Sequence, residues 1–203
     1  MWESFLSSLL DYLVLPRKTD QIVRTLTLDE LYSLVLHSED QGLLPYQDER
    51  VRALVWELKY YANKHAAALA ALVLHETLIT IASEELGKPL LIPVPMHKAR
   101  RRARGHNQTE VLCEALLAHV GEFFVYAPDV LVRHMHTEQQ QGLQKDRRLK
   151  NVAGSMHSKP QVQGRTCVVV DDVTTTGATF AEATRALKEA GAQRVICVAL
   201  AKS

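Results

Sequence analysis

Residues 167–179, "CVVVDDVTTTGAT", constrain the fold of this chain more than any other stretch. Four apolar residues, 167–170, follow one another without polar alternation, which is typical of a strand covered on both faces of a parallel sheet. After Gly177 the apolar positions follow helical spacing up to Gly191, a residue type that commonly ends helices. The stretch therefore predicts a strand, a loop at its carboxyl end and a helix over 178–190. Ligands of open α/β folds bind at such loops.

The loop has the composition of a site for a sugar phosphate. A helix N-terminus presents unpaired N–H groups and a partial positive charge, which attract phosphate. The threonine hydroxyls add donors, and Gly177 allows the backbone to close around an anion. The carboxylates of Asp171 and Asp172 suit a sugar diol or a magnesium ion. Phosphate beside a diol indicates a ribose 5-phosphate.

Three other interpretations share parts of this signature. A P-loop requires a lysine after its glycine, and none follows Gly177. A dinucleotide fingerprint requires three spaced glycines, and this loop contains one. An ordinary strand-to-helix connection stays open, because Asp and Thr are common capping residues.

The rest of the chain predicts one α/β domain, for which 203 residues are sufficient. From Leu90 onward, predicted strands and helices alternate, which favours a parallel sheet. The strands are expected at 90–95, 129–133, 166–170 and 194–201, and the helices at 107–119 and 178–190. Residues 1–86 have helical patterns instead, at 27–37, 48–61 and 65–86. We therefore expect a helical N-terminal cap over the sheet's carboxyl edge (1–86) and a Rossmann-like core (87–203).

Composition narrows the function classes. A net charge of +1 gives no global bias toward nucleic acid. Cys113, Cys167 and Cys197 are widely separated and form no CxxC, so we expect neither a zinc knuckle nor a disulfide framework. No apolar run long enough to span a membrane is expected, and the N-terminal segment lacks the basic flank of a signal peptide. We expect a cytoplasmic protein without membrane association. An apolar stripe over residues 2–13 is compatible with docking on the body or with a homodimer.

Five cations between Lys98 and Arg104 follow the Pro-Val-Pro end of the strand at 90–95. Charge runs are commonly solvated surface. In a parallel sheet, however, this loop lies on the edge that carries the Asp171 loop. A pyrophosphate leaving group requires positive charge there.

Residues 133–151, "RHMHTEQQQGLQKDRRLKN", form a long polar connection between two predicted strands. Such a segment is typical of a mobile loop that excludes water from an active site, or of an exposed connection without function. His134 and His136 lie at alternate positions, but no third ligand is near in sequence. We interpret both as solvated or hydrogen-bonded rather than metal-binding.

Residues 167–179 resemble the signature of type I phosphoribosyltransferases, in which hydrophobic residues precede two acids and a Thr/Gly loop. This resemblance implies a parallel-sheet phosphoribosyltransferase-like fold. It also implies binding of phosphoribosyl pyrophosphate (PRPP), which carries the magnesium ion, so no direct metal ligand is expected. Asp171 and Asp172 would be catalytic residues that hold the ribose hydroxyls, and 174–179 would bind the 5-phosphate. The implied substrate site comprises Asp171, Asp172, Val173, Thr174, Thr175, Thr176, Gly177, Ala178 and Thr179. The implied pyrophosphate loop comprises Met96, His97, Lys98 and Arg101.

A second pattern resembles the ComF branch of this superfamily, the competence-related proteins. Its mobile-loop pattern is matched in order and spacing by Thr137, Gln140, Leu143, Arg148 and Asn151. "RARGHNQ" resembles the branch's Arg-Gly-Phe-Asn-Gln element, with His106 in place of the aromatic residue, and "LKY" resembles another of its elements. ComF proteins commonly begin with a four-cysteine zinc module. Residues 1–112 contain no cysteine, so no zinc is expected.

The resemblance leaves two functions open. One is transfer of the ribosyl 5-phosphate of PRPP to an unidentified acceptor. The other is a non-catalytic PRPP-binding scaffold or sensor that acts in DNA uptake with a competence helicase. The five cations between Lys98 and Arg104 exceed what one pyrophosphate requires, so weak binding of single-stranded nucleic acid, with Arg100, Arg101 and Arg102 as candidate phosphate contacts, is a further expectation. The basic segment itself contains no aromatic residue on which bases could stack.

Overall fold

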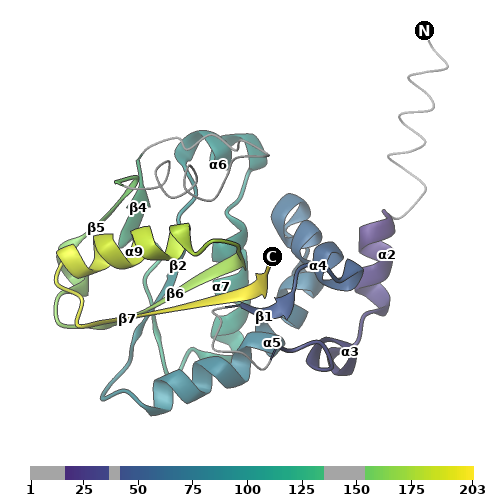
Figure 1. Cartoon of the computed structure of the whole chain (residues 1–203), viewed down its shortest axis with the longest axis horizontal. Helices are drawn as coiled ribbons and strands as arrows, with labels where there is room; N and C mark the ends of the chain where they lie inside the picture. The colour runs from purple at the N-terminus through teal and green to yellow at the C-terminus, as the bar shows by residue number, and fades with distance from the viewer. Residues whose placement is uncertain (1–16, 37–41, 135–153) are drawn as a thin grey trace, which may run out of the picture.

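The computed structural model describes residues 17–36, 42–134 and 154–203 (Figure 1). The N-terminal stripe and the predicted mobile-loop residues Thr137, Gln140, Arg148 and Asn151 lie outside these ranges. The helices are α2 (Lys18–Thr25), α3 (Leu28–Tyr32), α4 (Glu49–Tyr61), α5 (Lys64–Ser83), α6 (Lys98–Arg104), α7 (Gln108–Val120) and α9 (Ala178–Glu189), with a 3-10 turn at Pro160–Val162. The strands are β1 (Gly42–Pro45), β2 (Leu90–Pro93), β3 (Val125–Tyr126), β4 (Leu131–Arg133), β5 (Met156–Ser158), β6 (Thr166–Thr174) and β7 (Arg194–Lys202).

Five strands form one sheet in the order β1-β7-β6-β2-β3, and every neighbouring pair is parallel. β6 lies at its centre, with Val169 opposite Ile92 of β2 and Cys197 of β7. Alternate residues of β6 enter two separate hydrophobic clusters: Val168 and Val170 one, Cys167 and Val169 the other. The uninterrupted apolar run is thus explained by burial on both faces. The predicted parallel α/β fold is confirmed.

Helices cover both faces of the sheet (Figure 1). α5 and α7 pack together on one face, where α5 contacts β7 and α7 contacts β2 and β6. α9 covers the other face together with a two-stranded ribbon of β4 and β5. The N-terminal region is helical as predicted, but α5 lies against a face of the sheet rather than over its carboxyl edge.

Two strands differ from the sequence analysis. β1 lies inside the region expected to be helical, and it extends the sheet by pairing with β7. The two backbones approach so closely that a Cβ on Gly42 would lie 2.8 Å from atoms of Ala201 and Lys202. β4 does form a strand, but it pairs antiparallel with β5 outside the parallel sheet. Leu131 of β4 is buried with Met156 of β5 in the hydrophobic cluster that also contains Phe180 and Leu187 of α9. The ribbon therefore buries its apolar side chains without joining the parallel sheet.

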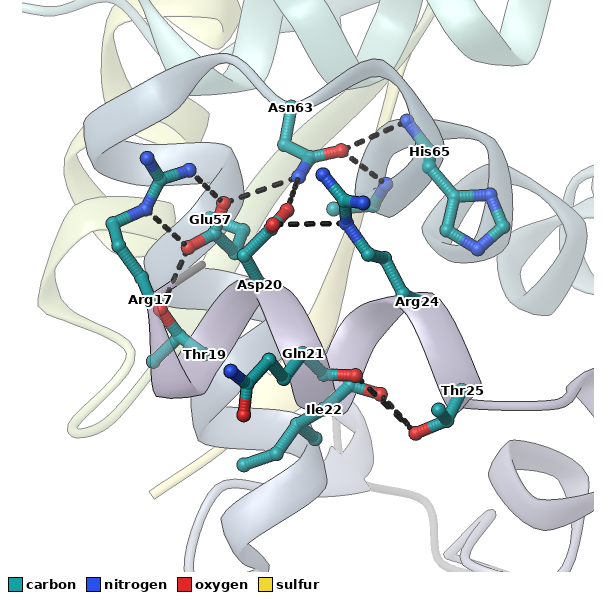
Figure 2. A network of polar contacts seen from close by, with 11 residues as sticks. Arg17, Thr19, Asp20, Gln21, Ile22, Arg24, Thr25, Glu57, Asn63 and His65 are labelled. Carbon is teal, nitrogen blue, oxygen red and sulfur yellow. Dashed lines mark hydrogen bonds and ion pairs between the residues drawn. The ribbon is translucent and has the colours of Figure 1, made fainter. Parts of the chain in front are cut away.

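A buried polar network fixes α2 against α4 and the start of α5 (Figure 2). Glu57 of α4 is fully buried, and its carboxylate accepts hydrogen bonds from Arg17 (3.0 and 3.2 Å), Thr19 (2.6 Å) and Asn63 (3.1 Å). Asn63 also caps α5 by accepting from the N–H groups of His65 and Ala66. All hydrogen-bonding capacity of the Glu57 carboxylate is directed at these groups, which is how a buried charge is tolerated.

One expectation requires correction. By length and composition α5, Lys64–Ser83, could cross a membrane, although no such run was expected. The alanine-rich stretch raises its hydropathy, and Ala66, Ala70, Leu74 and Leu78 of this helix are buried in the larger hydrophobic cluster. A core helix passes the same test, so this length of helix is weak support for a membrane span.

Candidate functional site

The acidic pair lies at the carboxyl end of the central strand. Asp171 and Asp172 are only 7% and 6% exposed. The Asp172 N–H donates to Asp171 Oδ1, and the Val173 N–H donates to Asp172 Oδ1, both at 2.9 Å. Asp172 Oδ2 is buried and has no hydrogen-bond partner in the described part of the chain. Burial raises the pKa of Asp171 well above its usual range, and the adjacent charge of Asp172 raises it further. The pair therefore presents buried acceptors to a donor such as a sugar hydroxyl.

The Thr/Gly loop connects this pair to α9. Gly177 has φ +75°, in the left-handed region that favours glycine, and α9 begins directly after it. The N-cap residue, Gly177, has no side chain that could cap α9, and the Ala178 N–H donates to Thr176 Oγ1 over a long 3.4 Å. A helix terminus without a side-chain cap can attract an anion, and phosphate binding at this loop stays a prediction.

A cavity of about 140 Å³ lies beside the acidic pair. Seven segments of the chain meet around it, so residues far apart in sequence share one site. It is lined by Lys59, Val94, Pro95, Met96, Arg100, Arg104, Asn107, Gln108, Arg133, Asp171, Asp172 and Thr179. Of the predicted site residues, Met96, Asp171, Asp172 and Thr179 are brought together here. Four cationic side chains face the two carboxylates.

The basic run is a helix and not the expected loop. His97 caps α6, its Nδ1 accepting from the Ala99 N–H at 3.2 Å, and Gly105 ends the helix with φ +87°. The helix divides the cations between two faces. Arg100 and Arg104 line the cavity, whereas Lys98, Arg101 and Arg102 line a shallow pocket on the outer side. Arg101 is paired there with Glu110 at 2.6 Å. The structure therefore does not bring Lys98 and Arg101, two of the predicted pyrophosphate-loop residues, to the acidic pair.

The residues after α6 hold the end of β2 in place. The Val94 carbonyl accepts from Asn107 Nδ2 (3.1 Å) and from Thr109 Oγ1 (2.7 Å). Arg104 donates to Gln108 Oε1 at 2.8 Å, and His106 Nε2 lies 3.1 Å from the Leu58 carbonyl of α4. The "RGHNQ" element thus joins β2, α6, α7 and α4 around the cavity.

Arg133 is one of the cavity-lining residues that the sequence did not assign to the site; Lys59 and Asn107 are others. Arg133 ends β4, a strand of three residues, and nothing in its local sequence distinguishes it from an exposed arginine. In the folded chain its Nε and Nη2 atoms are buried and have no hydrogen-bond partner among the described residues. Burial lowers the pKa of its guanidinium, and the charge of Asp171 partly opposes that shift.

His134 lies next to Arg133 on the exposed side of the ribbon. Its Nδ1 is 3.2 Å from Nδ1 of His157, which agrees with the interpretation of His134 as hydrogen-bonded. His136 is outside the described residues. Within residues 17–36, 42–134 and 154–203, no three His, Cys, Asp or Glu side chains are grouped to hold a metal ion.

Comparison with known proteins relates this chain to one family. Residues 110–203 match the phosphoribosyl transferase domain family. The DNA utilization protein YhgH of Salmonella typhi is 36% identical over 146 residues, 70% of this chain and 63% of that protein. Competence protein F of Haemophilus influenzae is 34% identical over 116 residues, 56% of this chain and 50% of that protein. The chain is therefore similar to the ComF and YhgH proteins, and its C-terminal part matches the phosphoribosyl transferase family.

The family resemblance stated from the sequence is thereby confirmed. The chain spans about 63% of the length of the YhgH protein, so the activity and partners of such longer relatives are proposals here. Among solved structures, a glutamine PRPP amidotransferase from B. subtilis has a TM-score of 0.43 and 18% identity, over 72% of this chain and 30% of that one.

Proposed function

We propose that this protein binds magnesium-PRPP and transfers its ribosyl 5-phosphate to an acceptor. The observation that carries the proposal is the cavity itself: two buried carboxylates, an anion-ready helix terminus and four cations face one another. Asp171 and Asp172 offer acceptors to the two ribose hydroxyls. The loop of residues 174–179 and the first turn of α9 offer donors to the 5-phosphate. Lys59, Arg100, Arg104 and Arg133 offer positive charge to the pyrophosphate.

The residues also fit the metal that such a ligand carries. Magnesium prefers oxygen ligands and usually keeps several waters, and the Asp172 Oδ2 atom is a buried oxygen without a partner among the described residues. Magnesium supplies charge neutralisation at the departing pyrophosphate. The chain's own contribution is to orient the ribose through the carboxylates and to hold the leaving group among the cations.

A binding assay and a turnover assay test the proposal together. Calorimetry with PRPP and magnesium should give binding that Asp171→Asn with Asp172→Asn weakens by a few kcal/mol, because each charge-assisted bond contributes about 1.5–3 kcal/mol. Asp29→Asn, an exposed carboxylate on α3, serves as the matched control and should bind normally. Equal affinity in the double variant would remove the ribose assignment. Release of pyrophosphate across a panel of nucleobases then identifies turnover.

A second candidate is a PRPP-binding scaffold that acts in DNA uptake with a helicase and contacts single-stranded DNA. The names of the relatives, competence protein F and DNA utilization protein, support this role. So does a surface feature that the sequence did not indicate. Trp56 and Tyr60 of α4 are 46% and 44% exposed, with ring centroids 4.2 Å apart, and Arg104 of α6 lies over the Tyr60 ring at 5.1 Å. α4 thus provides the stacking surface that the basic segment lacks. Tight PRPP binding without turnover on any acceptor would favour the scaffold.

A further inference from the structure

We propose that Arg133 is a ligand-binding residue of this site and that its guanidinium holds a phosphate group of the bound ligand. The inference rests on the proposed PRPP site for the identity of the ligand, but it does not depend on turnover. Arg133 lies outside every motif from which the family resemblance was drawn.

The guanidinium of Arg133 has buried N–H groups without hydrogen-bond partners among the described residues. Arginine stays charged in proteins and offers five N–H donors, and a buried charge without partners is strongly unfavourable. Two of the three nitrogens of Arg133, Nε and Nη2, are buried without a hydrogen-bond partner in the described part of the chain. These two atoms form one edge of the guanidinium, the edge that binds a phosphate or carboxylate through two parallel hydrogen bonds.

The neighbouring carboxylate of Asp171 does not neutralise the charge of Arg133. No ion pair joins Arg133 to Asp171 within 4.0 Å among the residues described, although both line the same cavity. Among the described residues that line the cavity, the four cations Lys59, Arg100, Arg104 and Arg133 outnumber the two carboxylates. A ligand with several negative charges, such as a diphosphate, is the complement of this cavity.

Arg133 is held in place by the pairing of β4 with β5 and by the contacts of β5 with α9. It pairs with Met156 in the β4–β5 register. The Met156 N–H donates to Glu182 Oε1, and the Met156 carbonyl accepts from Arg185 Nη2, both at 2.8 Å. Glu182 and Arg185 belong to α9, the same helix whose N-terminus faces the proposed 5-phosphate. The ribbon and the helix thus form one unit that positions Arg133, as a preorganised binding site requires.

The test uses inorganic pyrophosphate as the probe, with PRPP and magnesium in parallel, and Arg133→Met as the variant. Removing the charge-assisted hydrogen bonds from Nε and Nη2 of Arg133 should weaken pyrophosphate binding about 10- to 100-fold. The same change removes an unpaired buried charge, so the melting temperature of the ligand-free protein should stay the same or rise. A residue with a purely structural role would give the opposite pattern, with a lower melting temperature and unchanged affinity. Arg52→Met, at an exposed position of α4, is the matched control and should leave both quantities unchanged.

The outcomes separate this inference from the proposed function. If PRPP and pyrophosphate bind Arg133→Met as tightly as the wild type, the role of Arg133 is overturned and the PRPP site stands. If the wild type binds pyrophosphate through Arg133 but does not bind PRPP, the proposed function fails and the role of Arg133 stands. If Arg133→Met does not fold, Arg133→Lys replaces it. Lysine keeps the charge but cannot form the two parallel bonds, so a loss of affinity is expected and equal affinity would overturn the inference.

Discussion

Asp171 is a residue whose role in binding opposes its contribution to stability. Its pKa in the folded chain is raised, first by burial and then by the charge of Asp172. The folded state therefore holds a proton that the unfolded state has already released. By linkage, this carboxyl lowers the free energy of unfolding as pH rises from its ordinary pKa of about 4 toward the raised value.

Asp171→Asn should accordingly raise the melting temperature of the ligand-free protein at pH 7–8 and reduce the decline of stability above pH 4. The gain should be on the order of 1–2 kcal/mol, because the amide removes the penalty of a buried charge. Thermal melts from pH 4 to 8 measure it. A variant that melts lower than the wild type at pH 8 would mean that the carboxylate is stabilised by partners in the folded chain.

Glu182 shows the opposite behaviour. Burial tends to raise its pKa, but hydrogen bonds from Arg185 and from the Met156 N–H outweigh burial and hold the pKa at about 2. Its contribution to stability is therefore complete above the ordinary pKa of about 4.3 and is lost as pH falls toward 2. Glu182→Gln should lower the free energy of unfolding at pH 7 by about 3 kcal/mol, since it leaves a partly buried arginine with one partner fewer.

The control for Glu182 is on the same helix. Glu189 also pairs with Arg185, at 2.5 Å, but its side chain is 65% exposed. Glu189→Gln should change stability by about 0.5 kcal/mol or less, because exposed pairs contribute little. Urea unfolding between pH 2 and 7 compares the two. Equal losses in both variants would refute the special role of the buried carboxylate.

At the scale of elements, the sequence predicted those helices and strands whose buried residues recur at a regular spacing. The run 167–170 and the helix after Gly177 were predicted because a central parallel strand and its following helix each have a regular hydrophobic period. β1 was missed because "GLLP" is too short for any period, and its place is decided by the close approach of Gly42 to β7. The sequence of α6 did indicate a helix, because Ala, Arg and Lys are good helix formers and Gly105 follows them. Arg133 had no such signal in the sequence, because its burial without hydrogen-bond partners among the described residues arises only when the chain is packed.

The α2–α4 contact gives a test at this scale. Two ion pairs join these helices: the buried Glu57 with Arg17, and the exposed Glu49 with Lys18 at 2.7 Å. Glu57→Gln should lower the free energy of unfolding by about 3 kcal/mol, because it disrupts a buried network (Figure 2). Glu49→Gln, which removes the exposed ion pair between the same two elements, should leave it nearly unchanged. Hydrogen exchange at the α2 amides should increase only in the Glu57 variant. Unchanged exchange there would show that α2 is held by its apolar contacts, such as Val23, instead.

At the scale of the whole molecule, a net charge of +1 conceals an uneven distribution. α6 places Arg100 and Arg104 in the cavity and leaves Lys98, Arg101 and Arg102 exposed on the outer face. The surplus of cations noted in the sequence is thus accounted for by two separate surfaces. The inner surface suits a small polyanion. The outer one carries three exposed cations, to which the proposed contact with single-stranded nucleic acid is assigned.

This division predicts that the two binding properties can be separated by mutation. Replacing Lys98, Arg101 and Arg102 with alanine should flatten the dependence of single-stranded DNA affinity on salt by about two units, since each phosphate contact contributes about 0.7. PRPP affinity should not change, because none of the three side chains lines the cavity. Arg104→Ala should weaken PRPP binding. Trp56→Ala should weaken DNA binding by about 1–3 kcal/mol without altering the salt slope, because stacking releases no counterions. An unchanged slope in the triple variant would assign the outer face to ordinary solvated surface, and a fall in its PRPP affinity would return those cations to the phosphoribosyl site.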